Sequence, residues 1–305
     1  MTSVRVSPFA GVAMSVPPTR SERNLLDLDE GVFRACFARR PFTISHQLVD
    51  HPLLTLPSLI ELSKRLPESN IRYNRGDVPP GQQLYTAPKT DLSIEETIRQ
   101  IELCGSWMVI RFVEQDAEYR ELLNQCLDEI QPLSEAINPG MFRREGFIFI
   151  SSPSSVTPFH ADPECNFLLQ IRGKKTASLF DVADRAIVSE EVLERCLSGE
   201  QFNAEFKDEY QEKALVFDLA PGDGLHFPPV WPHWVKNGGE VSISFSITFR
   251  TRESERSGII YNVNHRLRER GFNPAPYGKS ARRDAAKFYA FRTARRAKKL
   301  LRWSK

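Results

Sequence analysis

Between residues 147 and 250 the chain is a series of short strand-like segments separated by glycine and proline turns, and no other feature limits the fold as strongly. FIFISS, FLLQI, ASLF and LVFDL come first, and LHFPP, HWVKN and VSISFSITFR follow. Many short strands at close intervals predict a sandwich or barrel whose helices lie outside it. We therefore expect a mainly β fold with flanking helices.

The first half of the chain mixes helices with single strands. Helices are predicted at 28–40, 93–103 and 116–137, and strands at 42–48 and 107–113. Ser93 and Glu96 have the form of a capping box at the start of the second helix. Pro132 should bend or break the third helix, because proline cannot donate the helical hydrogen bond.

These patterns divide the chain into four expected parts. They are a flexible N-terminal lead at 1–24, a mixed α/β part at 25–140 that packs on the core, a β core at 141–256 with a charged helical insertion at 181–213, and a basic helical extension at 257–305. The lead is interrupted by prolines and does not resemble a signal peptide.

Composition favours an ordinary globular protein of the cytoplasm. Hydrophobic residues make up 41% of the chain and charged residues 26%. The five cysteines are an odd number without CxxC spacing, so neither a disulfide framework nor a thiolate zinc site is expected. No apolar run approaches the roughly 18 residues of a membrane span, so we expect no membrane partner.

Charge is distributed unevenly along the chain. Residues 279–305 hold eleven Lys or Arg and one Asp, which leaves 30 basic and 38 acidic residues, a net charge of −8, in residues 1–278. A basic helix with interleaved aromatic residues could bind nucleic acid. The apolar residues of this segment could instead form a homodimer or domain interface, with its charges merely solvated. Alternatively, the acidic body, residues 1–278, could bind the basic segment within the same chain.

His160 and Asp162 stand at the head of a strand-like segment. Residues i and i+2 of a strand project from one face, so the two side chains point together. They supply two of the three ligands of a 2-His-1-carboxylate site, which holds non-haem Fe(II). The alternative is a chance pair, because a lone histidine in a strand is more often a hydrogen-bonded core residue.

The third ligand must be a later histidine, and there are three: His226, His233 and His265. His233 is preferred because it follows a proline-rich turn at the start of a fresh strand. His226 competes with it, and strand alternation alone does not decide between them.

Several spaced motifs resemble the JmjC hydroxylases, the cupin-fold group that includes the asparaginyl hydroxylase acting on hypoxia-inducible factor. The motifs are TPFHAD (157–162), NFLLQIRGKK (166–175), PGD (221–223) and PPVWPHWV (228–235), and the resemblance covers about residues 145–250. It implies a double-stranded β-helix core, Fe(II), 2-oxoglutarate as cosubstrate, and His233 as the distal ligand.

The resemblance also implies a cosubstrate site. Lys175, with Lys174 as its alternative, falls at the position of the lysine that binds the far carboxylate of 2-oxoglutarate. Thr157 resembles a hydroxyl contact to the same group, and Asn166 an asparagine beside the cosubstrate. Ser246 stands where the hypoxia-factor enzyme has an asparagine, and that enzyme's upstream tyrosine has no counterpart.

The function implied is an Fe(II)- and 2-oxoglutarate-dependent dioxygenase that uses O2, releases succinate and CO2, and hydroxylates a macromolecule. A protein side chain is the expected substrate, and RNA bound through the basic tail is an alternative. Trp231 and Trp234 flank His233 and could wall the site or only pack. Two other readings are a non-catalytic cupin-like sensor and a cupin enzyme that needs no 2-oxoglutarate.

Overall fold

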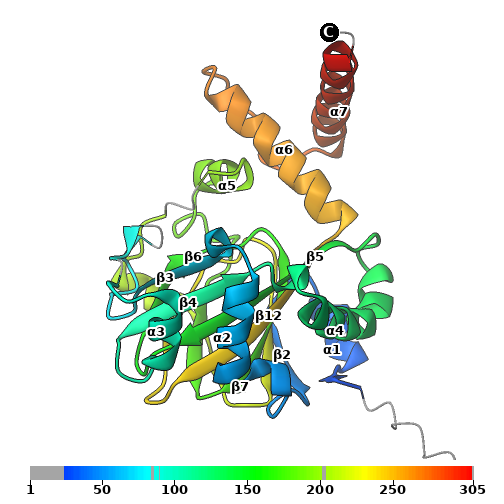
Figure 1. The fold of residues 1–305 in the computed structure, drawn as a ribbon. Helices are drawn as coiled ribbons and strands as arrows, with labels where there is room; N and C mark the ends of the chain where they lie inside the picture. Colours follow the sequence, from blue (N-terminus) through cyan, green and yellow to red (C-terminus); the bar gives the residue numbers. More distant parts are fainter. Residues whose placement is uncertain (1–23, 84–85, 89, 201–203, 304–305) are drawn as a thin grey trace, which may run out of the picture.

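The computed structural model describes residues 24–83, 86–88, 90–200 and 204–303, without the side chains of 298–303. The expected lead therefore lies outside the described residues except for Asn24. The core is a double-stranded β-helix made of two antiparallel sheets, with helices on the outside (Figure 1). The predicted fold class is confirmed.

The larger sheet has the strand order β1-β2-β10-β7-β12-β5-β4-β3. Its strands are β1 (Leu26–Asp27), β2 (Phe42–His46), β3 (Ile71–Arg75), β4 (Ser106–Arg111), β5 (Phe142–Ser151), β7 (Cys165–Arg172), β10 (Asp223–Phe227) and β12 (Ser242–Arg250). The smaller sheet has the order β6-β11-β8-β9, from β6 (Val156–His160), β8 (Lys175–Leu179), β9 (Leu215–Leu219) and β11 (His233–Asn237). Each strand-like segment of the second half therefore lies in one of these sheets.

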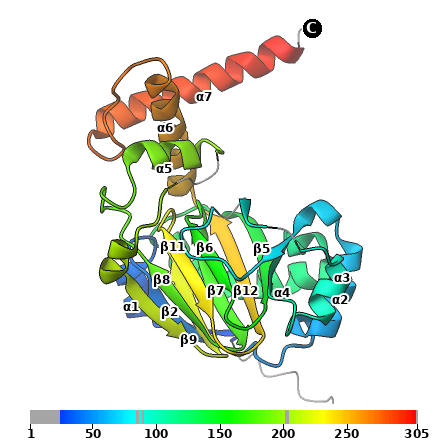
Figure 2. The same cartoon turned by 90° about the vertical axis from the view of Figure 1, so that its left-hand side faces the viewer.

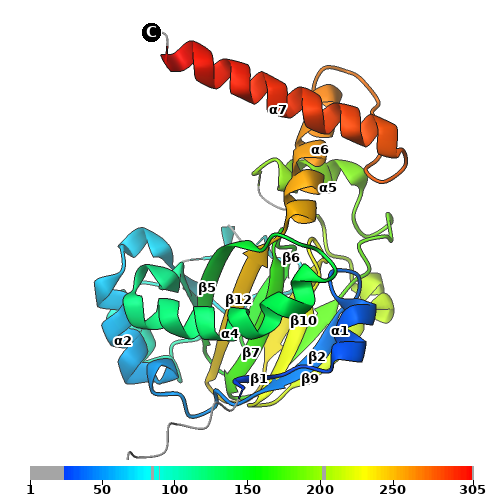
Figure 3. The ribbon, with the colours of Figure 1, turned by 90° about the vertical axis from the view of Figure 1, so that its right-hand side faces the viewer.

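Helices cover the outer face of the larger sheet (Figure 3). They are α1 (Glu30–Cys36), α2 (Leu56–Arg65), α3 (Ile94–Arg99) and α4 (Ala117–Glu135). The capping box of Ser93 and Glu96 begins α3 as predicted. Of the predicted bend or break at Pro132, the break is wrong, because α4 continues to Glu135. Pro132 stands in the last turn, where its missing N–H removes only one intrahelical bond.

The two faces of β12 lie in different environments. Its even positions Ser242, Ser244, Ser246 and Thr248 face the space between the sheets, and its odd positions Ile243, Phe245, Ile247 and Phe249 belong to the core beneath the helices. Burial of the apolar face fixes the strand, and the small polar face leaves room inside the barrel.

The remaining helices stand beyond one end of the barrel (Figure 2). α5 (Glu190–Leu197) and a 3-10 segment (Asp208–Lys213) are the only helical parts of the described residues in the 181–213 insertion. α6 (Arg252–Arg268) spans the expected boundary at residue 256, and α7 (Ala281–Trp303) confirms the helix expected in the basic tail.

Across the described ranges, no helix is both long enough and apolar enough to cross a lipid bilayer.

Candidate active site

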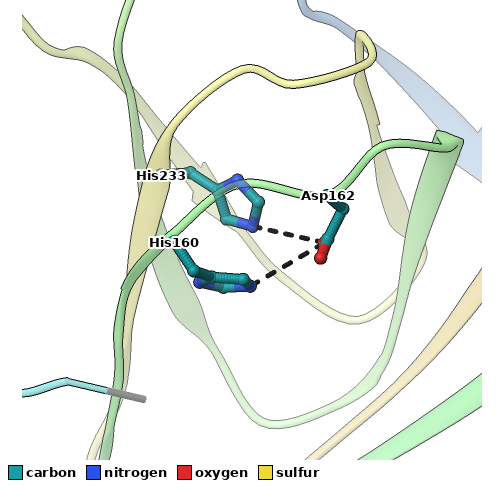
Figure 4. Close-up of side chains that lie close together, drawn as sticks. All are labelled: His160, Asp162 and His233. Carbon is teal, nitrogen blue, oxygen red and sulfur yellow. Dashed lines mark ion pairs between the residues drawn. The ribbon is translucent and has the colours of Figure 1, made fainter. Parts of the chain in front are cut away.

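His160, Asp162 and His233 converge at one end of the smaller sheet (Figure 4). His160 ends β6 and is paired in register with His233 at the start of β11. The Nε2 atoms of the two histidines lie 3.7 and 3.8 Å from Oδ2 of Asp162. One ligand atom from each residue fits within a span of 4.8 Å. The structure thus brings together the three residues that the sequence singled out.

A backbone carbonyl two residues earlier orients each histidine. Nδ1 of His160 lies 2.7 Å from the carbonyl oxygen of Pro158, and Nδ1 of His233 lies 2.9 Å from that of Trp231. A carbonyl only accepts, so each Nδ1 carries the proton and donates. Each Nε2 is then left with a free lone pair on the side of Asp162, which is the form that binds a metal.

Burial keeps His233 neutral. Desolvation, and then the nearby His160, lower the pKa of His233 to about 4, although Asp162 opposes the shift. The ring of Phe227 stacks on His233 with centroids 4.7 Å apart and planes 5° from parallel. At neutral pH the His233 ring is therefore unprotonated and packed against Phe227.

His226 lies elsewhere, in the core beneath α1. Its Nε2 accepts from the backbone N–H of Ala38 at 3.1 Å, and its Nδ1 donates to the carbonyl oxygen of Asn166 at 3.0 Å. Both ring nitrogens are used, so His226 has no lone pair for a metal. His265, on α6, is 3.0 Å from a carboxylate oxygen of Glu200. Of the three later histidines, His233 is the one that lies beside His160 and Asp162 in the part of the chain that the structure describes.

A pocket extends from the three residues into the barrel. It contains about 350 Å³ of space, including its open mouth, and Lys175 is the only lysine or arginine among the described residues that line it. Its lining consists of Phe149, Thr157, His160, Asp162, Asn166, Leu168, Lys175, Phe227, His233 and Val235. Charged and polar groups thus share an otherwise apolar cavity, a common form of small-molecule site.

Lys175 is buried without a counter-charge. Its side chain enters the barrel from the start of β8, and no acidic group pairs with it in the part of the chain that the structure describes. Burial lowers the pKa of Lys175 to about 7. An uncompensated buried amine is costly, and an anionic ligand would remove that cost. Its neighbour Lys174 is exposed, which excludes the alternative lysine from the pocket.

Thr157 and Asn166 line the pocket, and Ser246 does not. The hydroxyl of Ser246 instead donates to Oδ1 of Asn166 at 2.8 Å. This bond leaves the Asn166 amide N–H groups available on the pocket side. Ser246 therefore holds the Asn166 side chain in position from outside the pocket lining.

Trp231 and Trp234 pack outside the pocket. Trp231 is buried between the sheets, and Trp234 donates from its indole nitrogen to Oε1 of Gln211 at 3.0 Å. The sequence interpretation missed Phe149, Leu168, Phe227 and Val235 as lining residues. Strand alternation could have found Leu168 and Val235, which share a face with Asn166 and His233.

Comparison with known proteins supports the fold. A family model described as the cupin-like domain matches residues 95–255. The X-ray structure of E. coli ycfD matches with a TM-score of 0.51 and 16% identity over 84% of this chain and 62% of that one. A structure of YcfD, a ribosomal oxygenase from Escherichia coli, in complex with cobalt and 2-oxoglutarate gives a TM-score of 0.47 and 16% identity over 84% and 60%.

The chain thus spans about three fifths of the length of these solved structures. A search of curated proteins gave no significant match. At 16% identity, the match to the X-ray structure of E. coli ycfD, with its TM-score of 0.51, supports a common fold and nothing further.

Proposed function

The chain belongs to the cupin-like domain family, and on this premise we propose that it is an Fe(II)- and 2-oxoglutarate-dependent dioxygenase of JmjC type. It hydroxylates a C–H bond of a macromolecule, with residues 141–256 as its catalytic core. One observation carries this proposal: His160, Asp162 and His233 converge with both Nε2 lone pairs free, at the mouth of a pocket that contains a buried lysine.

The three side chains fit Fe(II). Two imidazole nitrogens and one carboxylate are the donor set of non-haem iron oxygenases, and this set leaves coordination positions open. The ligand atoms of the three residues lie within 4.8 Å of one another. Only small side-chain movements are therefore needed for all three to reach a central metal ion at bond lengths of about 2.1 Å. The two Nδ1–carbonyl bonds hold the rings in the metal-binding tautomer before any ion arrives.

When bound, the iron supplies activation of O2 and the oxidative decarboxylation of 2-oxoglutarate to succinate and CO2. The protein's own residues bind and orient the reactants and exclude water. Phe149, Leu168 and Phe227 give the pocket apolar walls. A water-poor pocket strengthens each charge interaction within it.

Lys175 is the proposed partner of the far carboxylate of 2-oxoglutarate. The carboxylate would favour the protonated amine, so Lys175 takes up or retains a proton when the anion binds. The Thr157 hydroxyl and the Asn166 amide are the proposed hydrogen-bonding groups beside it, both in the pocket lining. Charge and hydrogen bonds together select a short dicarboxylate over a neutral ligand of the same size.

A protein side chain is the proposed substrate. YcfD, which shares the fold, is a ribosomal oxygenase by name, and this likeness is an analogy of fold. The pocket is open on one side, next to His160, Asp162 and His233, so a side chain of a macromolecule can approach these residues from outside. The five cysteines are free, which supports a reducing compartment such as the cytoplasm.

The test is production of succinate by defined variants. Protein is loaded without oxygen with Fe(II) and 2-oxoglutarate, O2 is added, and succinate is quantified for wild type, His160→Ala, His233→Ala and His226→Ala. Binding of 2-oxoglutarate is measured in parallel by calorimetry, since turnover can require the substrate. We expect succinate from wild type and from His226→Ala only.

Two outcomes would replace this proposal. Iron binding without 2-oxoglutarate binding would indicate a cupin enzyme that uses no 2-oxoglutarate. Absence of both would indicate a non-catalytic binding module.

A further inference from the structure

The terminal helix α7 leaves the body of the protein. It runs out beyond α6 and away from the barrel (Figures 1 and 3). Its first half is anchored: Asp284 is buried and accepts from the N–H of Gly278 at 2.9 Å, and Lys287 donates to the carbonyl of Ala275 at 2.9 Å. From residue 292 to 297 every side chain is exposed.

The exposed part of α7 is cationic along one face. Arg292, Arg295 and Arg296 are spaced i, i+3 and i+4, so they share a side of the helix, and Lys299 continues this spacing in the sequence. No ion pair involves an α7 arginine or lysine in residues 281–297, where side chains are described. The single acid of the helix, Asp284, is turned inward. The acidic body therefore does not neutralise this helix.

Aromatic rings accompany the cations. Tyr289 is 66% exposed, and the guanidinium of Arg292 lies over the Phe288 ring at 5.4 Å from its centroid. Phe272, in the loop between α6 and α7, is 62% exposed. Cations that contact phosphates and rings that stack on unpaired bases are the two components of single-stranded nucleic-acid sites.

We propose that α7 binds RNA with unpaired bases, with Arg292, Arg295 and Arg296 on the phosphate backbone and Tyr289 on a base. This binding does not depend on the oxygenase chemistry. Residues 1–278 carry a net charge of −8, which disfavours a polyanion over most of the chain, so we place the contact on this helix.

A second copy of the chain fits this helix less well. A symmetric contact places the same surface on both partners, so the arginines of one α7 would meet those of the other. The exposed sequence RTARRA at 292–297 also has no large apolar side chain to form a helix seam. Charge complementarity therefore favours a polyanion.

The test compares two variants that change net charge equally. The triple variant Arg292→Glu, Arg295→Glu, Arg296→Glu alters α7. The control Arg39→Glu, Arg40→Glu, Arg120→Glu alters two exposed arginines between α1 and β2 and one on α4. Binding of a fluorescein-labelled single-stranded RNA of about 20 nucleotides to the full chain is followed by fluorescence anisotropy at several salt concentrations.

Wild type and the control should bind the RNA, and the α7 variant should bind it roughly tenfold or more weakly at low salt. The slope of log affinity against log salt should fall by about 2, which is three phosphate contacts at about 0.7 each. Tyr289→Ala should weaken binding to the single strand more than to an RNA duplex. Circular dichroism and 2-oxoglutarate binding unchanged from wild type would establish that the variants fold.

Three results would overturn the proposal. Equal weakening by both triple variants would show only an effect of net charge. Equal affinity for polyglutamate and RNA would assign the helix to an acidic protein. A dimer in light scattering that the α7 variant dissociates, together with no RNA binding, would assign it to a second copy.

Discussion

The hydroxyl of Ser246 on β12 donates a 2.8 Å hydrogen bond to Oδ1 of Asn166 on the adjacent strand β7. Asn166 lines the pocket and Ser246 does not, so we propose that Ser246 acts on a bound ligand through Asn166. The direct contact of Ser246 with the cosubstrate stays a prediction beside this proposed positioning role.

Ser246→Ala should weaken 2-oxoglutarate binding severalfold, because it frees the Asn166 amide to rotate. Ser244→Ala is the matched control, since Ser244 donates to Oε1 of Gln170 at 2.7 Å, away from the pocket lining. Each change should cost about 1 kcal/mol of stability. Calorimetry should show weaker 2-oxoglutarate binding by Ser246→Ala than by Ser244→Ala. Equal affinities of the two variants would contradict the positioning role of Ser246.

Lys175→Met should abolish measurable 2-oxoglutarate binding and stabilise the ligand-free protein. The pKa of Lys175 is lowered to about 7 when folded, so the unfolded chain binds more protons between pH 7 and 10.5. Lysine at this position thus costs stability below pH 10.5. We expect the variant's unfolding midpoint at pH 7.5 to rise by about 2 °C or more, and a lower midpoint would contradict the prediction.

The affinity for 2-oxoglutarate should fall as pH rises above 7. Below pH 7 the amine of Lys175 is already protonated, whereas above it each binding event must also take up a proton. The decline should approach tenfold per pH unit until the pKa of the bound state is reached. Lys175→Arg is the control, because a guanidinium stays charged throughout this range. The affinity of both proteins is measured from pH 6 to 9, a range that extends about one unit or more to either side of the lysine pKa. If the affinities of wild type and Lys175→Arg changed in parallel with pH, Lys175 would not be the titrating group.

His226 should make the metal-free protein sensitive to acid. Burial lowers its pKa to about 3, so the stability tied to the neutral ring is complete above pH 6.5 and is lost as pH falls toward 3. Between pH 7 and pH 5 the loss is roughly 2 kcal/mol.

His226→Leu removes that dependence but leaves the Ala38 N–H and the Asn166 carbonyl without their partner. The variant should be less stable than wild type at pH 7, by an amount that shrinks by roughly 2 kcal/mol at pH 5. Urea unfolding at the two pH values measures this difference. A constant difference would show that His226 does not titrate as proposed.

Local sequence pattern was enough to predict the strands and two of the three residues of the candidate metal site. Short alternating segments between tight turns admit few arrangements other than stacked or closed sheets, and the fold class follows. His160 and Asp162 could be paired because i and i+2 share a face wherever the strand lies. α7 could be predicted from its composition, but its projection away from the acidic body could not.

The choice between neighbouring candidates needed the tertiary structure. Lys174 and Lys175 are adjacent, and the turn at Gly173 sets which of them faces inward. Gly173 has φ +68°, and a Cβ there would lie 2.5 Å from the carbonyl oxygen of Val241. The close approach of the Gly173 turn to Val241 determines which residues of β8 face the inside of the barrel. The local sequence does not contain this information.

The sequence by itself therefore determined the fold class, the His160–Asp162 pair and the candidates for the third ligand. Only the tertiary structure placed His233, and not His226, beside that pair. β11 pairs with β6 in the smaller sheet, whereas β10 places His226 in the larger sheet, against Phe37 and Phe42. Which strands become neighbours depends on the burial of whole sheet faces, a property of the assembled chain.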